Sequence, residues 1–138
     1  MLLAVATVVS GGAPAMADSF ISKASDNAKV YIISPLDGTT VSSPFTVQFG
    51  LSGMGIAPAG IDRPGTGHHH LLVDLETLPD LDKALSATEN IKHFGGGQTE
   101  ATLALPPGEH TLQLLLGNYA HIPHDPLVLS EPITITVK

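Results

Sequence analysis

The residues whose types suggest chemistry are the seven histidines, all of which lie between positions 68 and 124. Three are consecutive, in the stretch TGHHHLLVD at residues 66–74, and the others are His93, His110, His121 and His124. Neutral imidazoles from separate segments suit Zn(II) or Cu(II), which take three or four ligands at metal–nitrogen distances of about 2.0 Å. The chain contains no cysteine, which excludes thiolate metal sites and thiol catalysis.

The elements that position these histidines are expected to be short strands. The 138 residues include 14 Gly and 11 Pro beside abundant Val, Leu, Ile and Thr, a composition that favours strands and frequent turns. Residues 45–51 alternate apolar and polar side chains, and residues 133–137 form a β-branched alternating run. With a first strand at residues 29–33, the pattern predicts an all-β fold, an immunoglobulin-like antiparallel β-sandwich of about seven strands.

This topology predicts that distant histidines meet. We assign residues 45–51 as strand B, 68–75 as C, 98–105 as E and 110–116 as F, with the last two forming a hairpin around PPGE. The loops that enter C and E and leave F share one end of such a sandwich. Six histidines therefore converge at that end: His68, His69, His70, His93, His121 and His124. Residues 76–92 are the least clear segment, with one or two helical turns expected near Pro79 to Leu85.

Strand parity divides the triplet, because alternate side chains of a strand point to opposite faces. His69 shares its parity with the apolar Leu71 and Val73, so we expect it in the core or behind a ligand. His68 and His70 point the other way and can share a metal ion, unless the strand begins later and all three fan outward. His110 is expected at the opposite end, in a structural role.

The predicted metal ligands are His68, His70, His93, His121 and His124. Met54 lies at the same end and could add a thioether, which would favour copper, although packing at a strand end is the interpretation we favour. Asp74 and Asp125 could accept hydrogen bonds from ligand imidazoles and fix their tautomers.

The leading hypothesis is an exported protein that binds copper or zinc through this histidine cluster and buffers or delivers the metal. One rival is a mononuclear metalloenzyme in which the metal activates water or oxygen, but Asp74, Asp125 and Glu100 are not compelling as its base. We therefore favour a role without turnover. The other rival is a metal-free module that binds an envelope protein, with the histidines forming a hydrogen-bonded or pH-responsive network. The absence of Trp and the presence of only two Tyr argue against carbohydrate stacking.

Charge and the N-terminal sequence restrict the partners and the location. Six Lys and Arg against 13 Asp and Glu give a net charge of -7, which disfavours nucleic acid. Residues 1–17, MLLAVATVVSGGAPAMA, resemble a signal peptide, although no Lys or Arg follows Met1. Their apolar run is shorter than the roughly 20 residues of a membrane span. We expect a flexible tether at 18–28, a folded domain at 29–138, and a periplasmic or secreted protein with no membrane span after cleavage.

Five stretches carry a resemblance to a known family. They are GIAPAG (55–60), TGHHHLLVD (66–74), HFGGGQTE (93–100), LPPGEHTLQLLLGN (105–118) and HIPHDP (121–126). Together the sequence resembles a family of uncharacterised, exported bacterial proteins classed as a domain of unknown function. The resemblance implies export and a compact β domain, and it implies no activity.

Overall fold

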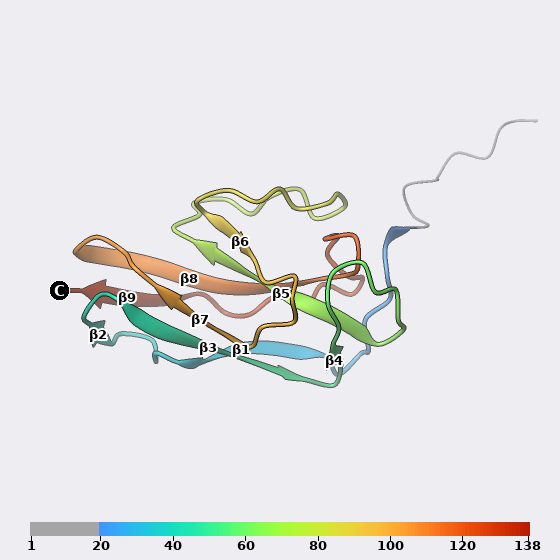
Figure 1. The fold of residues 1–138 in the computed structure, drawn as a ribbon, viewed down its shortest axis with the longest axis horizontal. Helices are drawn as coiled ribbons and strands as arrows, with labels where there is room; N and C mark the ends of the chain where they lie inside the picture. Colours follow the sequence, from blue (N-terminus) through green and yellow to red (C-terminus); the bar gives the residue numbers. More distant parts are fainter. Residues whose placement is uncertain (1–19) are drawn as a thin grey trace, which may run out of the picture.

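The computed structural model describes residues 20–138, and within them the chain is all-β with no α-helix. A three-stranded sheet has the order β1-β3-β7, formed by Lys29–Ser34, Phe45–Ser52 and Glu100–Leu103 (Figure 1). A larger sheet has the order β2-β9-β8-β5-β4, formed by Thr40–Val41, Ile133–Val137, Gly108–Gly117, Thr66–Val73 and Gly55–Ile56. A further strand, β6 (Ile91–His93), also pairs with β5. The all-β prediction is confirmed, whereas the immunoglobulin-like form with about seven strands stays a prediction.

Strand β5 is the central element for function, because it carries the histidine triplet. Along one edge it pairs antiparallel with β8, from His68 opposite Gly117 to Val73 opposite Leu112. It also pairs in parallel with β4 at its start and antiparallel with β6 near its end, at His70 to Leu72. Every residue of β5 after the first is buried. This explains why its sequence does not alternate between apolar and polar residues.

The two faces of β5 meet different apolar clusters. Leu71 and Val73 belong to the main core between the two sheets, together with Val47, Leu114 and Ile135. Leu72 belongs to a second cluster with Leu85, Ile91 and Leu115. The segment before β6 therefore covers the outer face of the large sheet, on the side away from β1 and β3 (Figure 1). Side chains of both parities along β5 are thus shielded from water.

Two sequence expectations about connections were wrong. Strand β7 pairs with β3, and β8 pairs with β5 and β9, so the expected hairpin between residues 98–105 and 110–116 does not form. Two consecutive prolines, at 106 and 107, cannot donate to a ladder, and here the chain crosses from one sheet to the other. The helical turn expected near Pro79 to Leu85 is also absent, and the described chain has only turns there before β6.

The segment expected to be a flexible tether is attached to the body where the structure describes it. Ala24 is buried in the main core, and its N–H donates to the carbonyl of Asp125 at 3.0 Å. The N–H of Asp125 donates in turn to the carbonyl of Ser22 at 3.0 Å, and Ser25 Oγ donates to the carbonyl of Gly53 at 2.7 Å. These bonds tie the N-terminal segment to the loop after β8 and to the turn after β3. The predicted signal peptide at 1–17 lies outside the described residues.

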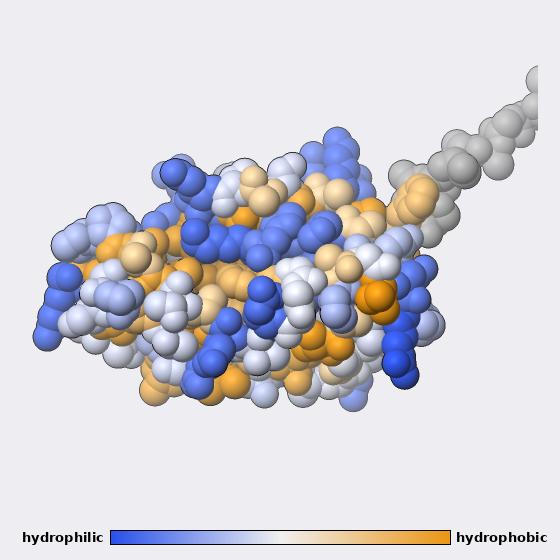
Figure 2. Space-filling view, viewed as in Figure 1, coloured by the Kyte–Doolittle hydropathy of each residue, from blue (hydrophilic) through white to orange (hydrophobic). Residues whose placement is uncertain are grey.

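The described surface mixes polar and apolar side chains. On the face drawn in Figure 2, hydrophilic residues are interspersed among hydrophobic ones. No helix within residues 20–138 has the length and the apolar character needed to cross a membrane.

Candidate metal centre

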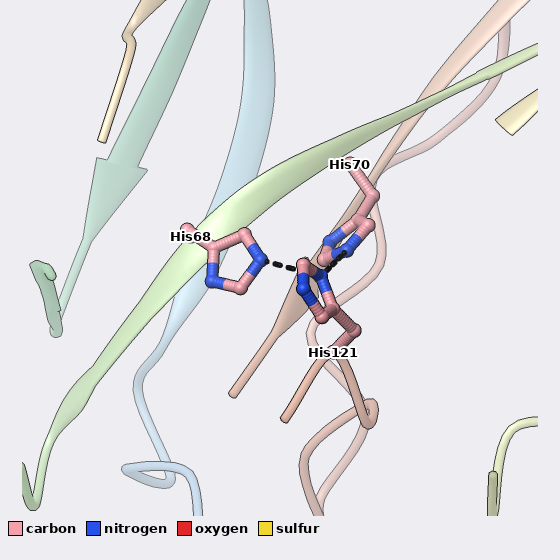
Figure 3. Close-up of side chains that lie close together, drawn as sticks. All are labelled: His68, His70 and His121. Atoms are coloured by element: carbon pink, nitrogen blue, oxygen red, sulfur yellow. Dashed lines mark hydrogen bonds between the residues drawn. The ribbon is translucent and has the colours of Figure 1, made fainter. Parts of the chain in front are cut away.

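Three imidazoles converge on the outer face of the large sheet. His68 and His70 project from the same face of β5, and His121 reaches them from the loop after β8 (Figure 3). His68 Nε2 lies 3.0 Å from His121 Nδ1, and His70 Nε2 lies 3.1 Å from the same atom. One nitrogen from each ring falls within 4.8 Å of the others. We call these residues the three-histidine group.

The geometry of the three-histidine group fits a metal ion. Two nitrogens that each lie about 2.0 Å from a tetrahedral metal are about 3.3 Å apart, so the two separations from His121 Nδ1, 3.0 and 3.1 Å, need only a small expansion. His68 and His70 have no exposed surface, and His121 is half-buried. The group could therefore hold a metal ion that is largely shielded from solvent.

The position of His121 depends on an unusual turn. Its φ is 62°, in the left-handed region that non-glycine residues seldom adopt. Its N–H donates to the carbonyl of Asn118, and its carbonyl accepts a hydrogen bond from the N–H of Leu85 at 2.8 Å. The side chain of Asn118 accepts bonds from the N–H groups of Ala120 and Ile122. The surrounding segments thus hold a conformation that aims an imidazole at β5, and such strain often accompanies function.

Asn118 also anchors this turn to the N-terminal segment. Its Nδ2 donates to the carbonyl of Phe20 at 2.7 Å and to Ser22 Oγ at 3.0 Å. A carboxylate could not donate either bond. The amide at position 118 is therefore required by its partners.

Two glycines provide space for histidine rings. A Cβ on Gly117 would lie 2.5 Å from Cε1 of His70, and a Cβ on Gly67 would lie 2.8 Å from Cε1 of His124. Both distances are below any normal contact, so larger residues at these positions would displace the rings. These two requirements were not recognised in the sequence, although both glycines flank histidine-bearing segments.

His93 lies beside the three-histidine group and belongs to β6, directly opposite His70 in the pairing with β5. Its ring stacks on that of His121 at a centroid distance of 4.5 Å and meets the ring of His70 edge-on at 4.5 Å. Its Nε2 is buried and has no hydrogen-bond partner among the described residues. The sequence predicted that His93 would be close, but it placed His93 in a loop instead of a strand.

The other predicted participants are placed elsewhere. His124 Nε2 lies 3.0 Å from the carbonyl oxygen of Thr66, and its ring packs against Gly67 outside the group. His69 points to the core side, as parity predicted, with its ring centroid 5.1 Å from that of Phe49. Met54 packs against the main core.

The two candidate acceptors for ligand imidazoles do not face the cluster. Asp74 Oδ2 lies 2.7 Å from His110 Nδ1, and its Oδ1 accepts the N–H of Thr111. The side chain of Asp125 is exposed. Asp74 therefore supports His110, the histidine expected to be structural.

Burial favours the neutral form of His68, His70 and His93. It is the main cause that lowers the pKa of His68 to about 4 and that of His70 to about 2. Repulsion from neighbouring histidines lowers both further, and burial followed by His121 lowers the pKa of His93. A neutral ring carries one N–H and one lone pair, so a metal ion can bind His68 and His70 in the tautomer that has its lone pair at the ligand nitrogen, without releasing a proton.

A purely structural network is the alternative use of these residues. His121 Nδ1 could accept hydrogen bonds from both Nε2 atoms, but Nδ1 of His68 and Nδ1 of His70 are buried without partners in the described chain. Each unsatisfied group costs about 1–3 kcal/mol, and apolar side chains would fill the same space without that cost. Filling this interior with imidazoles therefore lowers the stability of the fold, and such local losses of stability commonly mark functional sites.

Comparison with known proteins adds a family and no activity. Residues 47–138 match a family described as "Domain of unknown function (DUF4399)", a segment that contains the three-histidine group and His93. The comparisons with curated proteins and with solved structures gave no match. The match supports the family resemblance seen in the sequence, and the function has to be argued from the site.

Proposed function

Since the DUF4399 family, to which the chain belongs, is a family of domains of unknown function, we propose a function from the site alone. The chain would be an exported binding protein for a transition-metal ion. The ion would be copper or zinc, and the protein would buffer or deliver it. The observation that carries the proposal is the approach of His68 Nε2 and His70 Nε2 to a single atom, His121 Nδ1, at 3.0 and 3.1 Å. Imidazole nitrogens are suitable ligands for both metals.

The proposed ligands are His68, His70 and His121. His93 was also expected as a ligand from the sequence, but it only stacks on His121 beside the three converging nitrogens, so it is left out of the proposed set. His124 is left out of the proposed set, because the backbone carbonyl of Thr66 already engages its Nε2. Export to the periplasm or outside the cell is supported by the signal-like sequence at residues 1–17.

A binding role is better supported than catalysis. A metal that activates water normally works with a nearby base, and no Asp or Glu belongs to the converging group among the described residues. A specific partner protein in the envelope has no support from the described surface. The proposal therefore rests on the converging histidines.

The direct test is to measure metal content and metal-dependent stability of the untagged mature protein. Elemental analysis should find about one ion of copper or zinc for each chain. Because a ligand that binds only the folded state stabilises it, an ion at about 100 times its Kd should add about 2.7 kcal/mol to the free energy of unfolding. Isothermal titration would give the affinity.

Matched variants make the test specific. His68→Gln and His121→Gln should each reduce the affinity at least a hundredfold. His110→Gln removes a histidine outside the cluster and should leave the affinity unchanged. Absence of stoichiometric metal, together with an unchanged melting temperature at excess copper and zinc, would refute the proposal.

A further inference from the structure

Within residues 20–138, no carboxylate belongs to the candidate metal centre to compensate the charge of a bound cation. The ligand atoms that meet here within 4.8 Å of one another all belong to histidines, and no Asp or Glu joins the group. Asp74, four residues after His70, is bound to His110, and the side chain of Asp125, four residues after His121, is exposed. A metal ion held by neutral imidazoles would therefore keep its full charge in this interior.

Uncharged residues border His121 on two sides. Leu85 and Asn118 hold the backbone of His121. Gly95 also lies beside His121. A Cβ added to Gly95 would be 4.0 Å from Cε1 of His121 and 3.2 Å from Cβ of Ala59. The residues that reach the histidines thus contribute apolar and amide groups.

The charge of the ion then decides how costly its burial is. The Born cost of moving an ion from water into a medium of low dielectric constant rises with the square of its charge. A divalent ion in the same site costs about four times as much as a monovalent one, unless an anion enters with it. Two of the three ligand residues, His68 and His70, have no exposed surface, so solvent offers little relief.

The number of ligands favours the same ion. Three nitrogens, one from each ring, converge within 4.8 Å. Zinc sites require a fourth ligand, which is water or substrate where the protein supplies three. Cu(I) has a filled d shell and forms stable three-coordinate complexes, so three imidazoles satisfy it without an added ligand.

Resting on the proposed function, we propose that the centre formed by His68, His70 and His121 selects the monovalent cuprous ion, Cu(I), over divalent ions. The cargo of the protein is then copper in its reduced state. The selecting property is a group of three converging imidazole ligands that no anionic side chain of residues 20–138 joins.

The first experiment compares three ions on the full mature chain without a tag. Cu(I) is titrated without oxygen in competition with bicinchoninate, and Cu(II) and Zn(II) are titrated with competing chelators in a buffer free of coordinating anions. We expect one Cu(I) per chain and an affinity for Cu(I) at least tenfold above that for either divalent ion. His68→Gln should abolish the Cu(I) binding.

The second experiment adds one negative charge beside the site. Gly95→Asp places a carboxylate near the ring of His121, and Gly95→Asn is its neutral control of nearly the same shape. The φ of Gly95 lies outside the left-handed region, so both side chains are compatible with the backbone, and the 3.2 Å contact with Ala59 needs only a small shift. A carboxylate attracts a divalent ion about twice as strongly as a monovalent one. After screening by solvent, the ratio of the affinity for divalent ions to the affinity for Cu(I) should be about tenfold higher in the Asp variant than in the Asn variant.

The outcomes separate this inference from the proposed function. If Cu(II) or Zn(II) binds the unmodified chain more tightly than Cu(I), or if the Asp and Asn variants show the same ion preference, the cuprous assignment is wrong and metal binding stands. If none of the three ions binds stoichiometrically, the proposed function itself fails. Circular dichroism checks that both variants fold, and if they do not, the comparison on the unmodified chain decides.

Discussion

Gly117 gives the sharpest test of how the fold builds the site, because the position has no side chain where His70 needs room. A Cβ added there would lie 2.5 Å from Cε1 and 2.9 Å from Nδ1 of the His70 ring. Gly117 is not among the glycines with positive φ, so alanine is compatible with the local backbone. Gly117→Ala therefore perturbs the ring of His70 without straining the strand.

The size of the effect follows from these distances. Ordinary contacts begin at 3.4 Å, so the ring of His70 has to retreat by about 0.9 Å. Metal–ligand distances tolerate only about 0.2 Å of variation, so the displaced Nε2 can no longer share an ion with His68 and His121. We expect Gly117→Ala to lower the metal affinity about a hundredfold. Overpacking of this kind also lowers the free energy of unfolding by about 1–3 kcal/mol.

The assay is a double-mutant cycle measured by metal titration and urea unfolding. In a His70→Ala background the clash is gone, so Gly117→Ala should be neutral or stabilising by up to about 1 kcal/mol, as for glycine to alanine elsewhere in strands. The control is Gly55→Ala, whose Cβ would meet only Cγ2 of Thr66 at 3.9 Å. If Gly117→Ala binds metal as the unmodified chain does, or if its cost persists without His70, the assignment of this space to the His70 ring is wrong.

Three further predictions concern residues around the site and the far end of the sheet. His69→Leu should raise the free energy of unfolding by about 1 kcal/mol and leave metal affinity unchanged, because both ring nitrogens of His69 are buried without partners in residues 20–138; a loss of affinity on titration would instead make His69 part of the site. The hydrogen bond to Asp74 and that to the carbonyl of Pro106 raise the pKa of His110, so its contribution to stability is present below pH 6.5 and is lost as the pH rises through the folded pKa. The urea midpoint should therefore fall between pH 6 and pH 9 by more in the unmodified chain than in His110→Gln, and equal slopes would contradict this account. Asn118→Asp should cost at least about 2 kcal/mol and weaken metal binding about tenfold, because a carboxylate cannot donate to Phe20 and Ser22; unfolding and titration curves like those of the unmodified chain would count against this role of the amide.

The sequence predicted well where one periodic pattern determined the result. The all-β class followed from composition and alternation, and most strand cores lie where the pattern placed them. Parity placed His69 on the side of Leu71 and Val73, and His68 and His70 together on the other face. These conclusions need only the local geometry of a strand.

It predicted less well where partners are distant or elements are short. The strand that carries His93 has three residues, too few for a pattern to appear, so His93 was placed in a loop. The hairpin around PPGE looked plausible locally, but the choice of partner for β7 depends on β3, more than 50 residues earlier in the chain. His121 and His124 belong to one loop, and the left-handed turn at His121, which brings that residue to His68 and His70, has no signal in the sequence.

The arrangement of β5 suggests why three consecutive histidines occur here. A strand that is buried on both faces must place one imidazole of any such triplet in the core, and His69 occupies that position beside Phe49. A pair at His68 and His70 would suffice for ligation, so His69 is the member that the metal site does not need. If His69→Leu keeps full affinity, the triplet is functionally a pair separated by one residue, and position 69 is constrained only by packing. The spacing of the ligands on alternate residues, with a third supplied by a constrained loop, would then be the minimal description of this centre.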